Sequence, residues 1–283
     1  ILHIGDNGIM PMLSQPHHTL EIGKGARAEC IISFHSTTTT HEPRECALPI
    51  KVIRSNFTNA VIEMRIGAHA VCDLYIMEDE NDTQQTITST FCTADEGSQC
   101  SFYTFSFGGK LIRNSLSFTY EGSQAHGNFF GLYCTNGKNH IDNRTVISHE
   151  NTQCTTIQNY KGILGGDATG VFNGKIYVAP GAAKSSAVQI NKNILLSEKA
   201  TINTCPAFEI YADEVKCNHA AISGQLDEEA LFYMSARGIG RENATRLLTF
   251  AFASEIVEKI KLAPLELYMR EKTIAYLQTH TDS

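Results

Sequence analysis

An internal repeat constrains the fold of this chain more than any other feature of its sequence. The string EGSQC at residues 96–100 returns as EGSQA at 121–125 and as ENTQC at 150–154, and an alternating or apolar run follows each copy. The copies are spaced by roughly 25 to 30 residues. A unit of that length cannot bury its apolar face alone, so successive units must stack on one another. The repeat therefore predicts a solenoid.

The residues inside the repeat alternate with a period of two, which is the period of a β-strand. From Ala60 to Ile76 the even positions are apolar, whereas the odd positions include Glu63, Arg65 and Asp73. This pattern indicates extended chain with one buried face and one face in water. It favours a mainly β fold, a parallel β-helix (β-solenoid). A β-sandwich is the alternative, because evenly spaced short strands suit both folds.

The period changes from two to that of a helix after Gly224. Asp227 can cap a first helix, which Gly238 ends. A second helix is expected from about Arg241 to Lys261, and Pro264 suits the first position of a third. The chain is therefore expected to divide into a β-helix core domain at residues 1–224 and a small C-terminal α-helical domain at residues 225–283.

Composition excludes several classes of function. The net charge is −7 and Lys and Arg form no cluster, so a nucleic-acid partner is not expected. No apolar run approaches the ~20 residues that a membrane-spanning helix needs, so no membrane association is expected. The nine cysteines are dispersed and form no CxxC pair. An odd count in a chain of this length favours reduced thiols and a cytoplasmic location.

Two soft-metal ligands, Cys217 and His219, lie two residues apart where the strand pattern gives way to the helical tail. On a strand both side chains would project from one face, roughly 6.6 Å apart at ~3.3 Å per residue. That spacing suits two donors to one metal or one cluster. The ordinary alternative is a buried thiol beside a surface imidazole. A second candidate set consists of the carboxylates Glu209, Asp213 and Glu214, which could act as acid and base or could form a solvated face.

The segment FEIYADEVKCNHAAISGQLDEEALFYMSARGI, residues 208–239, closely resembles the C-terminal signature of the SufB/SufD family of iron-sulfur cluster assembly proteins. The run GKIYVAPGAAKSSAVQINKNILLSEKA extends the match upstream to about residue 174, and the Cys-x-His version looks like the SufD type. The resemblance implies a right-handed parallel β-helix followed by a small helical domain. The N-terminal helical region usual in the family is expected to be absent here.

The resemblance also implies a role as a scaffold that is not itself an enzyme. A SufD-type protein pairs with a SufB-like subunit through the β-helix, and a homodimer is expected when that subunit is withheld. The SufD-type and the SufB-like subunit each bind one SufC-like ABC ATPase through the helical domain. A transient iron-sulfur cluster shared with the partner would form at the interface near His219 and Cys217, with no permanently bound cofactor. SufC docking is expected at Asp227, Glu228, Glu229, Phe232, Tyr233 and Arg237.

Two departures and two alternatives accompany this resemblance. Asn218 and Ala220 flank the histidine where the family commonly has Ser and Gly, and Ala disfavours the positive φ that Gly permits.

The chain could instead be a SufB-type subunit. It could also be a β-helix carbohydrate-active enzyme that uses Glu209 or Asp213, although such an enzyme should line its groove with aromatics and this chain has no Trp.

Overall fold

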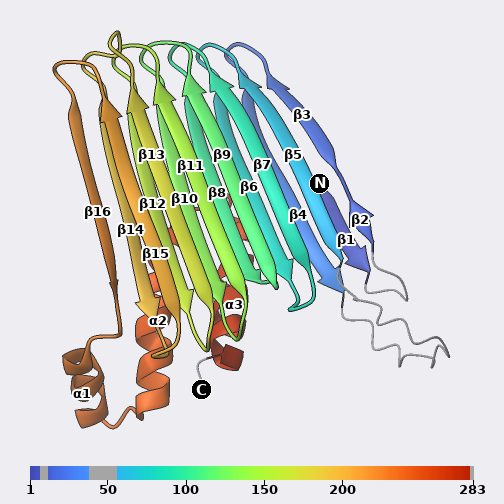
Figure 1. Cartoon of the computed structure of the whole chain (residues 1–283), viewed down its shortest axis with the longest axis vertical. Coiled ribbons are helices and arrows are strands. Elements are labelled where there is room, and N and C mark those ends of the chain that lie inside the picture. Colours follow the sequence, from blue (N-terminus) through green and yellow to red (C-terminus); the bar gives the residue numbers. More distant parts are fainter. Residues whose placement is uncertain (7–11, 38–55, 281–283) are drawn as a thin grey trace.

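The computed structural model describes residues 1–6, 12–37 and 56–280, which form a parallel β-solenoid with three helices at its C-terminal end (Figure 1). Two sheets make up the solenoid. Sheet A runs in the order β1 (Leu2–Asp6), β4 (Arg27–Thr37), β6 (Val71–Glu80), β8 (Gln99–Gly108), β10 (His126–Thr135), β12 (Thr155–Leu164), β14 (Ser186–Leu195) and β16 (Lys216–Gly224). Sheet B runs in the order β15 (Thr201–Ile210), β13 (Thr169–Val178), β11 (His140–His149), β9 (Leu111–Tyr120), β7 (Gln85–Ala94), β5 (Phe57–Ile66) and β2 (Leu13–Ser14), and β3 (His17–Ile22) also pairs with β5.

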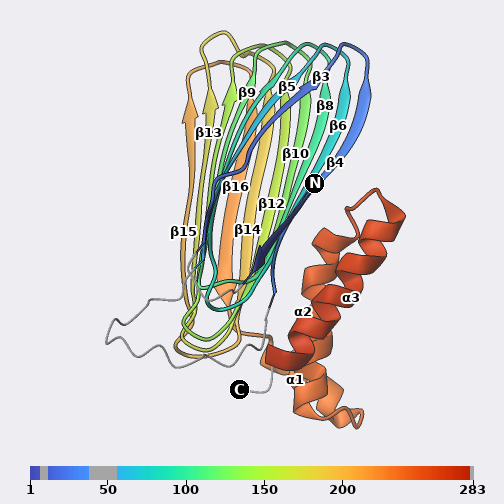
Figure 2. The ribbon, with the colours of Figure 1, turned by 90° about the vertical axis from the view of Figure 1, so that its right-hand side faces the viewer.

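From β4 onward, successive strands in the described chain alternate between the two sheets, so each coil adds one strand to each sheet. Every pairing between the described strands is parallel, as in the β10–β12 and β11–β13 ladders. Parallel neighbours need a crossover, and here the opposite sheet supplies it. The predicted β-solenoid is confirmed, and the β-sandwich alternative is wrong. Figure 2 looks along the stack of coils, so the two sheets are seen edge-on with the helices on one side.

The solenoid interior is filled by the even-phase residues that the alternation predicted. Ala60, Ile62 and Leu74 are fully buried in one cluster that extends along the coils. The three motif residues Cys100, Ala125 and Cys154 also belong to this cluster, so they share the inner face.

The first copy of the motif is displaced in register from the other two. Gln99 pairs with His126, and His126 pairs with Thr155, so Ala125 aligns with Cys154 whereas Cys100 pairs with Gly127. The motif begins one residue later in its turn, and that turn is one residue shorter than the next two. The resulting shift of two residues equals the strand period, so it leaves every side chain on the same face.

The helices are α1 (Glu228–Ala236), α2 (Arg241–Val257) and α3 (Ala263–His280). The predicted cap is confirmed, because the Glu229 backbone N–H donates to Asp227 Oδ1 at 2.9 Å. Gly238 follows α1 with a φ of +84°, the left-handed conformation that glycine adopts most readily. The predicted end of α2 at Lys261 is wrong. The helix stops at Val257, and the next turn lies against sheet A, where the Tyr103 hydroxyl donates to the Lys259 carbonyl.

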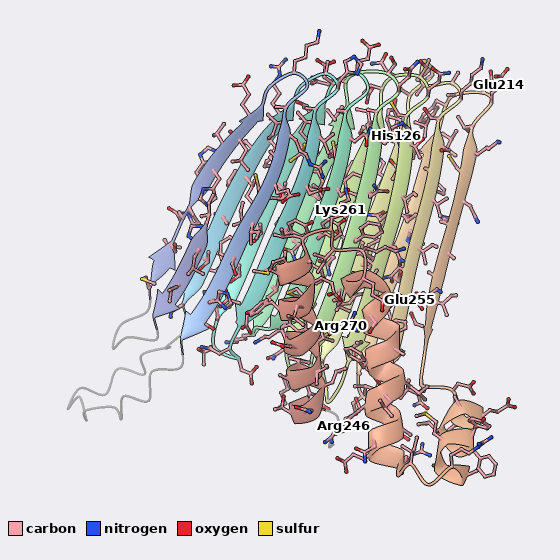
Figure 3. The ribbon with its side chains drawn as sticks, turned by 180° about the vertical axis from the view of Figure 1, so that it is seen from behind. His126, Glu214, Arg246, Glu255, Lys261 and Arg270 are labelled. Carbon is pink, nitrogen blue, oxygen red and sulfur yellow. The ribbon has the colours of Figure 1, made fainter. Side chains whose placement is uncertain are left out.

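Helices α2 and α3 cover part of the outer face of sheet A, as Figure 3 shows from behind. Their apolar residues, among them Ile256 and Met269, share a second cluster with Tyr75, Tyr103 and Phe130 of the sheet. The division at residue 225 into two domains stays a prediction. None of the helices in the described ranges is long and apolar enough to cross a membrane.

Ion pairs reinforce this helix–sheet contact. Lys161 Nζ lies 2.5 Å from Glu255 of α2, and Lys261 Nζ lies 2.7 Å from Asp73 Oδ1 of β6. Asp73 was expected on a face in water, and that expectation is wrong, because the helical segment covers it and leaves it 1% exposed.

Candidate functional site

Cys217 and His219 lie on β16, the last strand of sheet A, and face the last strand of sheet B, β15. Register places Cys217 beside Ala187 and His219 beside Gln189 on β14. Ala187 and Gln189 are both buried, so the pair projects from the same inner face of the strand. We call this end of the solenoid the mouth and define it by Ile202 and Phe208 of β15 together with Cys217 and His219 of β16.

The two donors differ in their surroundings. Cys217 is half-buried and packs against the interior cluster, and its thiol is free. Burial raises the pKa of the Cys217 thiol, and the backbone hydrogen bond associated with Ala187 offsets only part of that effect. The thiol therefore needs a metal ion or a base before it can act as a thiolate. His219 is exposed, and its imidazole can donate a lone pair without that step.

The His219 ring stacks on Phe208 from the opposite sheet. The ring centroids lie 5.1 Å apart and the planes differ by 12°. Phe208 was not singled out from the sequence, although it occupies an alternate position of β15, on the phase that points inward.

The mouth is bordered by exposed apolar side chains and by open strand edges. Ile210, Tyr211 and Ile222 are large hydrophobic residues that remain exposed around it. Strands β15 and β16 are the terminal strands of their sheets, so each has a neighbouring strand on one side within the described chain. An exposed edge presents unpaired backbone N–H and C=O groups to another chain, and a cluster of exposed apolar residues marks a contact surface.

The candidate carboxylates are not brought together in the interior. Glu209 forms an ion pair with Lys175 of β13 at 2.7 Å, and both side chains are partly exposed. Asp213 and Glu214 lie in the exposed turn between β15 and β16, where Figure 3 shows Glu214 at the end of the molecule remote from the helices. The described geometry therefore gives no support to an acid–base pair made from these residues.

The residues of α1 expected to bind a partner fall into two groups. Glu228 is held by Arg241 of α2 through two hydrogen bonds, at 3.0 and 2.6 Å, and these lower the pKa of its carboxyl. Arg237 donates to the Tyr233 hydroxyl at 3.0 Å and lies over its ring.

The second group contains the exposed aromatic side chains, and the residues of the first group are exposed as well. Phe232 is 76% exposed and Tyr233 is 60% exposed, while Glu229 is also at the surface. Leu247 on the adjoining helix α2 is 50% exposed. Asp227 has its carboxylate engaged as the helix cap. The aromatic side chains of α1, with Glu229 beside them, form the surface available for contact.

Sequence reasoning also missed two carboxyl groups inside the solenoid. Glu78 is fully buried and accepts from Thr88, Ser106 and Asn114, and burial raises its pKa. Glu80 is nearly buried, accepts from the Thr86 hydroxyl at 3.1 Å, and has a pKa raised to about 7, mainly by burial. The sequence did contain a signal for them, because both residues continue the even, inward phase of Leu74 along β6. Within residues 1–6, 12–37 and 56–280, no group of three or more His, Cys, Asp or Glu side chains could hold a metal ion.

The fold and its mouth define a parallel β-solenoid protein that offers a thiol and an imidazole at an open strand edge. Comparison with known proteins gives the family. The profile described as "SUF system FeS cluster assembly, SufBD core domain" matches residues 3–252, and the chain belongs to this SufBD family. Iron-sulfur cluster assembly is therefore the process in which its family acts.

Three relatives illustrate the similarity. The chain is 30% identical over 262 residues to an iron-sulfur cluster assembly SufBD family protein of Synechocystis sp., covering 92% of this chain and 56% of that protein. It is 29% identical over 244 residues to the iron-sulfur cluster assembly protein SufD of Escherichia coli, covering 86% and 54%. It is 30% identical over 204 residues to protein ABCI7, chloroplastic, of Arabidopsis thaliana, covering 72% and 43%. The chain spans about half the length of these relatives.

Proposed function

We propose that this chain is the SufD-type scaffold subunit of a SufBCD-type complex, in which a nascent iron-sulfur cluster forms at the mouth against a SufB-like subunit. The observation that carries the proposal is the placement of Cys217 and His219 on a terminal strand. Structural and catalytic metal sites take three or four protein ligands. Two donors at an open edge form half of such a set, and a partner that pairs with the edge can supply the remainder.

The cluster is cargo of the complex rather than a resident group of this subunit, and the subunit itself performs no catalysis. His219 is expected to matter more than Cys217, because its lone pair is available while the half-buried Cys217 thiol must first ionise. The β15 and β16 edges and the exposed Ile210, Tyr211 and Ile222 support pairing at this end. In the absence of the SufB-like subunit, a second copy of the chain can occupy the same edge and give a homodimer.

The SufC-like ABC ATPase is proposed to dock on the exposed side of α1, with Phe232 and Tyr233 as its apolar anchors and Leu247 beside them. Glu228 is engaged with Arg241 and contributes to the shape of this surface rather than to direct contact. The protein is proposed to act in a reducing compartment such as the cytoplasm, where the free thiols of the described cysteines are maintained.

The assignment is tested by anaerobic reconstitution of the full chain with a SufB-like subunit, a SufC-like ATPase, ferrous iron and a sulfur donor. The readouts are visible absorbance and acid-labile sulfide. His219→Ala is expected to retain the fold, the dimer and ATPase binding while strongly lowering cluster yield, and Cys217→Ala is expected to have a milder effect. His126→Ala, an exposed histidine on the same sheet (Figure 3), is the matched control. A wild-type yield from His219→Ala would refute the site.

ATPase docking has a separate test. Phe232→Ala is expected to weaken retention of the SufC-like ATPase in a pull-down by at least tenfold, because a central aromatic anchor accounts for ~2 kcal/mol or more of binding. Phe91→Ala removes an equally large side chain from the outer face of sheet B and should leave retention unchanged. Equal retention by both variants would remove α1 from the interface.

A further inference from the structure

The orientation of the His219 imidazole depends on a single ring contact. The imidazole stacks nearly parallel to the Phe208 ring, with centroids 5.1 Å apart and planes within 12°. Over the part of the chain that the structure describes, the imidazole makes no hydrogen bond, and its side chain is exposed. An exposed side chain with two rotatable bonds and no hydrogen bond samples several rotamers unless a packing contact selects one.

Phe208 is placed to select that rotamer because its own position is fixed. It packs against the interior cluster and lies in register with Ile176 of β13, which is fully buried. The ring is therefore supported from inside the solenoid while its outer face remains available to the imidazole.

The register neighbour of His219 on sheet A, Gln189, makes no hydrogen bond to the imidazole within the described residues. Gln189 is fully buried, and its Nε2 donates to Gln158 Oε1 on the preceding coil at 2.7 Å. The same nitrogen occupies the space above Gly174, where a Cβ atom would lie 2.4 Å from it. The amide nitrogen of Gln189 is thus committed to the coil beneath, while its buried Oε1 has no hydrogen-bond partner within the described residues. The contact that the His219 ring does make is with the aromatic face of Phe208.

We propose that Phe208 is a positioning residue for His219. The lone pair of a neutral imidazole lies in the ring plane, on the nitrogen that carries no proton, so stacking occupies only the ring face and leaves that nitrogen free to bind a metal. Because the plane is fixed, the nitrogen that binds iron is presented along the mouth toward the partner edge. The inference rests on the proposed function, since it assigns Phe208 to the ligand that the function requires.

The expected size of the effect follows from the cost of ordering a side chain on binding. Fixing one mobile side chain lowers affinity by roughly two- to tenfold. Phe208→Leu, which keeps an apolar side chain but removes the aromatic face, should therefore lower the initial rate of cluster formation by roughly two- to tenfold. Phe208→Tyr keeps the face and should restore the rate. Phe91→Leu makes the same substitution at an exposed site on the outer face of sheet B and should behave as wild type.

A structural readout accompanies the kinetic one. In the metal-free full chain, the His219 ring protons should show an upfield ring-current shift in NMR spectra, because they lie over the face of Phe208. The shift should be lost in Phe208→Leu and retained in Phe208→Tyr, and circular dichroism should show that both variants remain folded. An unchanged shift in Phe208→Leu would overturn the contact.

The outcomes separate this inference from the proposed function. If Phe208→Leu loses the ring-current shift but forms cluster at the wild-type rate, while His219→Ala does not form it, the positioning role is wrong and the proposed site stands. If His219→Ala also forms cluster normally, both are wrong. A reduced rate in Phe208→Leu that Phe208→Tyr restores supports the inference.

Discussion

The buried carboxyl of Glu80 should make the stability of this solenoid decrease as the pH rises. Glu80 lies in the interior next to Glu78, and burial raises its pKa from 4.5 to about 7, with Glu78 adding to the shift and the Thr86 hydrogen bond opposing it. The folded protein therefore keeps this proton up to a higher pH than the unfolded chain. The stabilisation from Glu80 is complete below about pH 4.5 and is lost as the pH rises through about 7.

The magnitude follows from the size of the shift. One pKa unit corresponds to about 1.4 kcal/mol, so the change from 4.5 to about 7 makes a contribution of about 3 kcal/mol, most of it lost between about pH 5 and 8. Glu80→Gln is neutral at every pH and cannot make this contribution. Relative to wild type, the variant should gain roughly 2 to 3 kcal/mol in the free energy of unfolding on going from about pH 5 to about pH 8.

The assay is urea denaturation of wild type and Glu80→Gln at both pH values. Glu78, whose pKa is also raised, remains in both proteins, so the difference between them reports Glu80 together with its coupling to Glu78. Glu121→Gln, in the exposed turn between β9 and β10, is the control and should show no such pH-dependent gain. If the difference between wild type and Glu80→Gln were the same at both pH values, Glu80 would not be held protonated by burial and the reasoning would fail.

Two further pairs of variants test the packing of the coils and of the helices. A Cβ at Gly122 would lie 1.9 Å from the backbone nitrogen of Glu96 in the preceding turn, so Gly122→Ala should lower the free energy of unfolding by about 3 kcal/mol, measured by denaturant titration. Gly224→Ala, with no atom within 4 Å of its Cβ, should change it by less than ~0.5 kcal/mol, and equal effects would contradict the packing argument. Glu255→Ala should cost about 2 kcal/mol, because it leaves the buried Lys161 ammonium without its carboxylate, whereas Lys161→Met should cost less than about 1 kcal/mol. The reverse order in thermal or urea unfolding would show that the lysine itself anchors α2.

Much of the fold was accessible from residue order alone. The two-residue alternation placed Ala60, Ile62 and Leu74 inside, and Asp227 and Gly238 marked the ends of α1. These features depend on interactions between residues close in the chain: the strand period, a cap and a left-handed glycine. The same alternation, continued past Ile76, would have placed Glu78 and Glu80 in the interior.

The register between coils was less accessible, because it depends on turn length. Cys100 pairs with Gly127 although its motif matches the one that ends at Ala125. A turn shorter by one residue and a motif that begins one residue later add up to a shift of two residues, and only the two together keep the apolar side chains inside. Burial therefore fixed the face of each residue, while the turns fixed the register.

The sequence by itself determined a stacked-strand solenoid with a helical tail and a Cys-x-His pair near its last strand, because these follow from local periodicity and short motifs. Only the tertiary structure decided that Asp73 is buried under the helical segment through Lys261, nearly two hundred residues later in the chain. It also decided that Phe208 stacks on His219 across the mouth, and that Glu209 faces outward to Lys175. These contacts join segments whose approach depends on how sheets and helices pack, and no local pattern in the sequence encodes that approach.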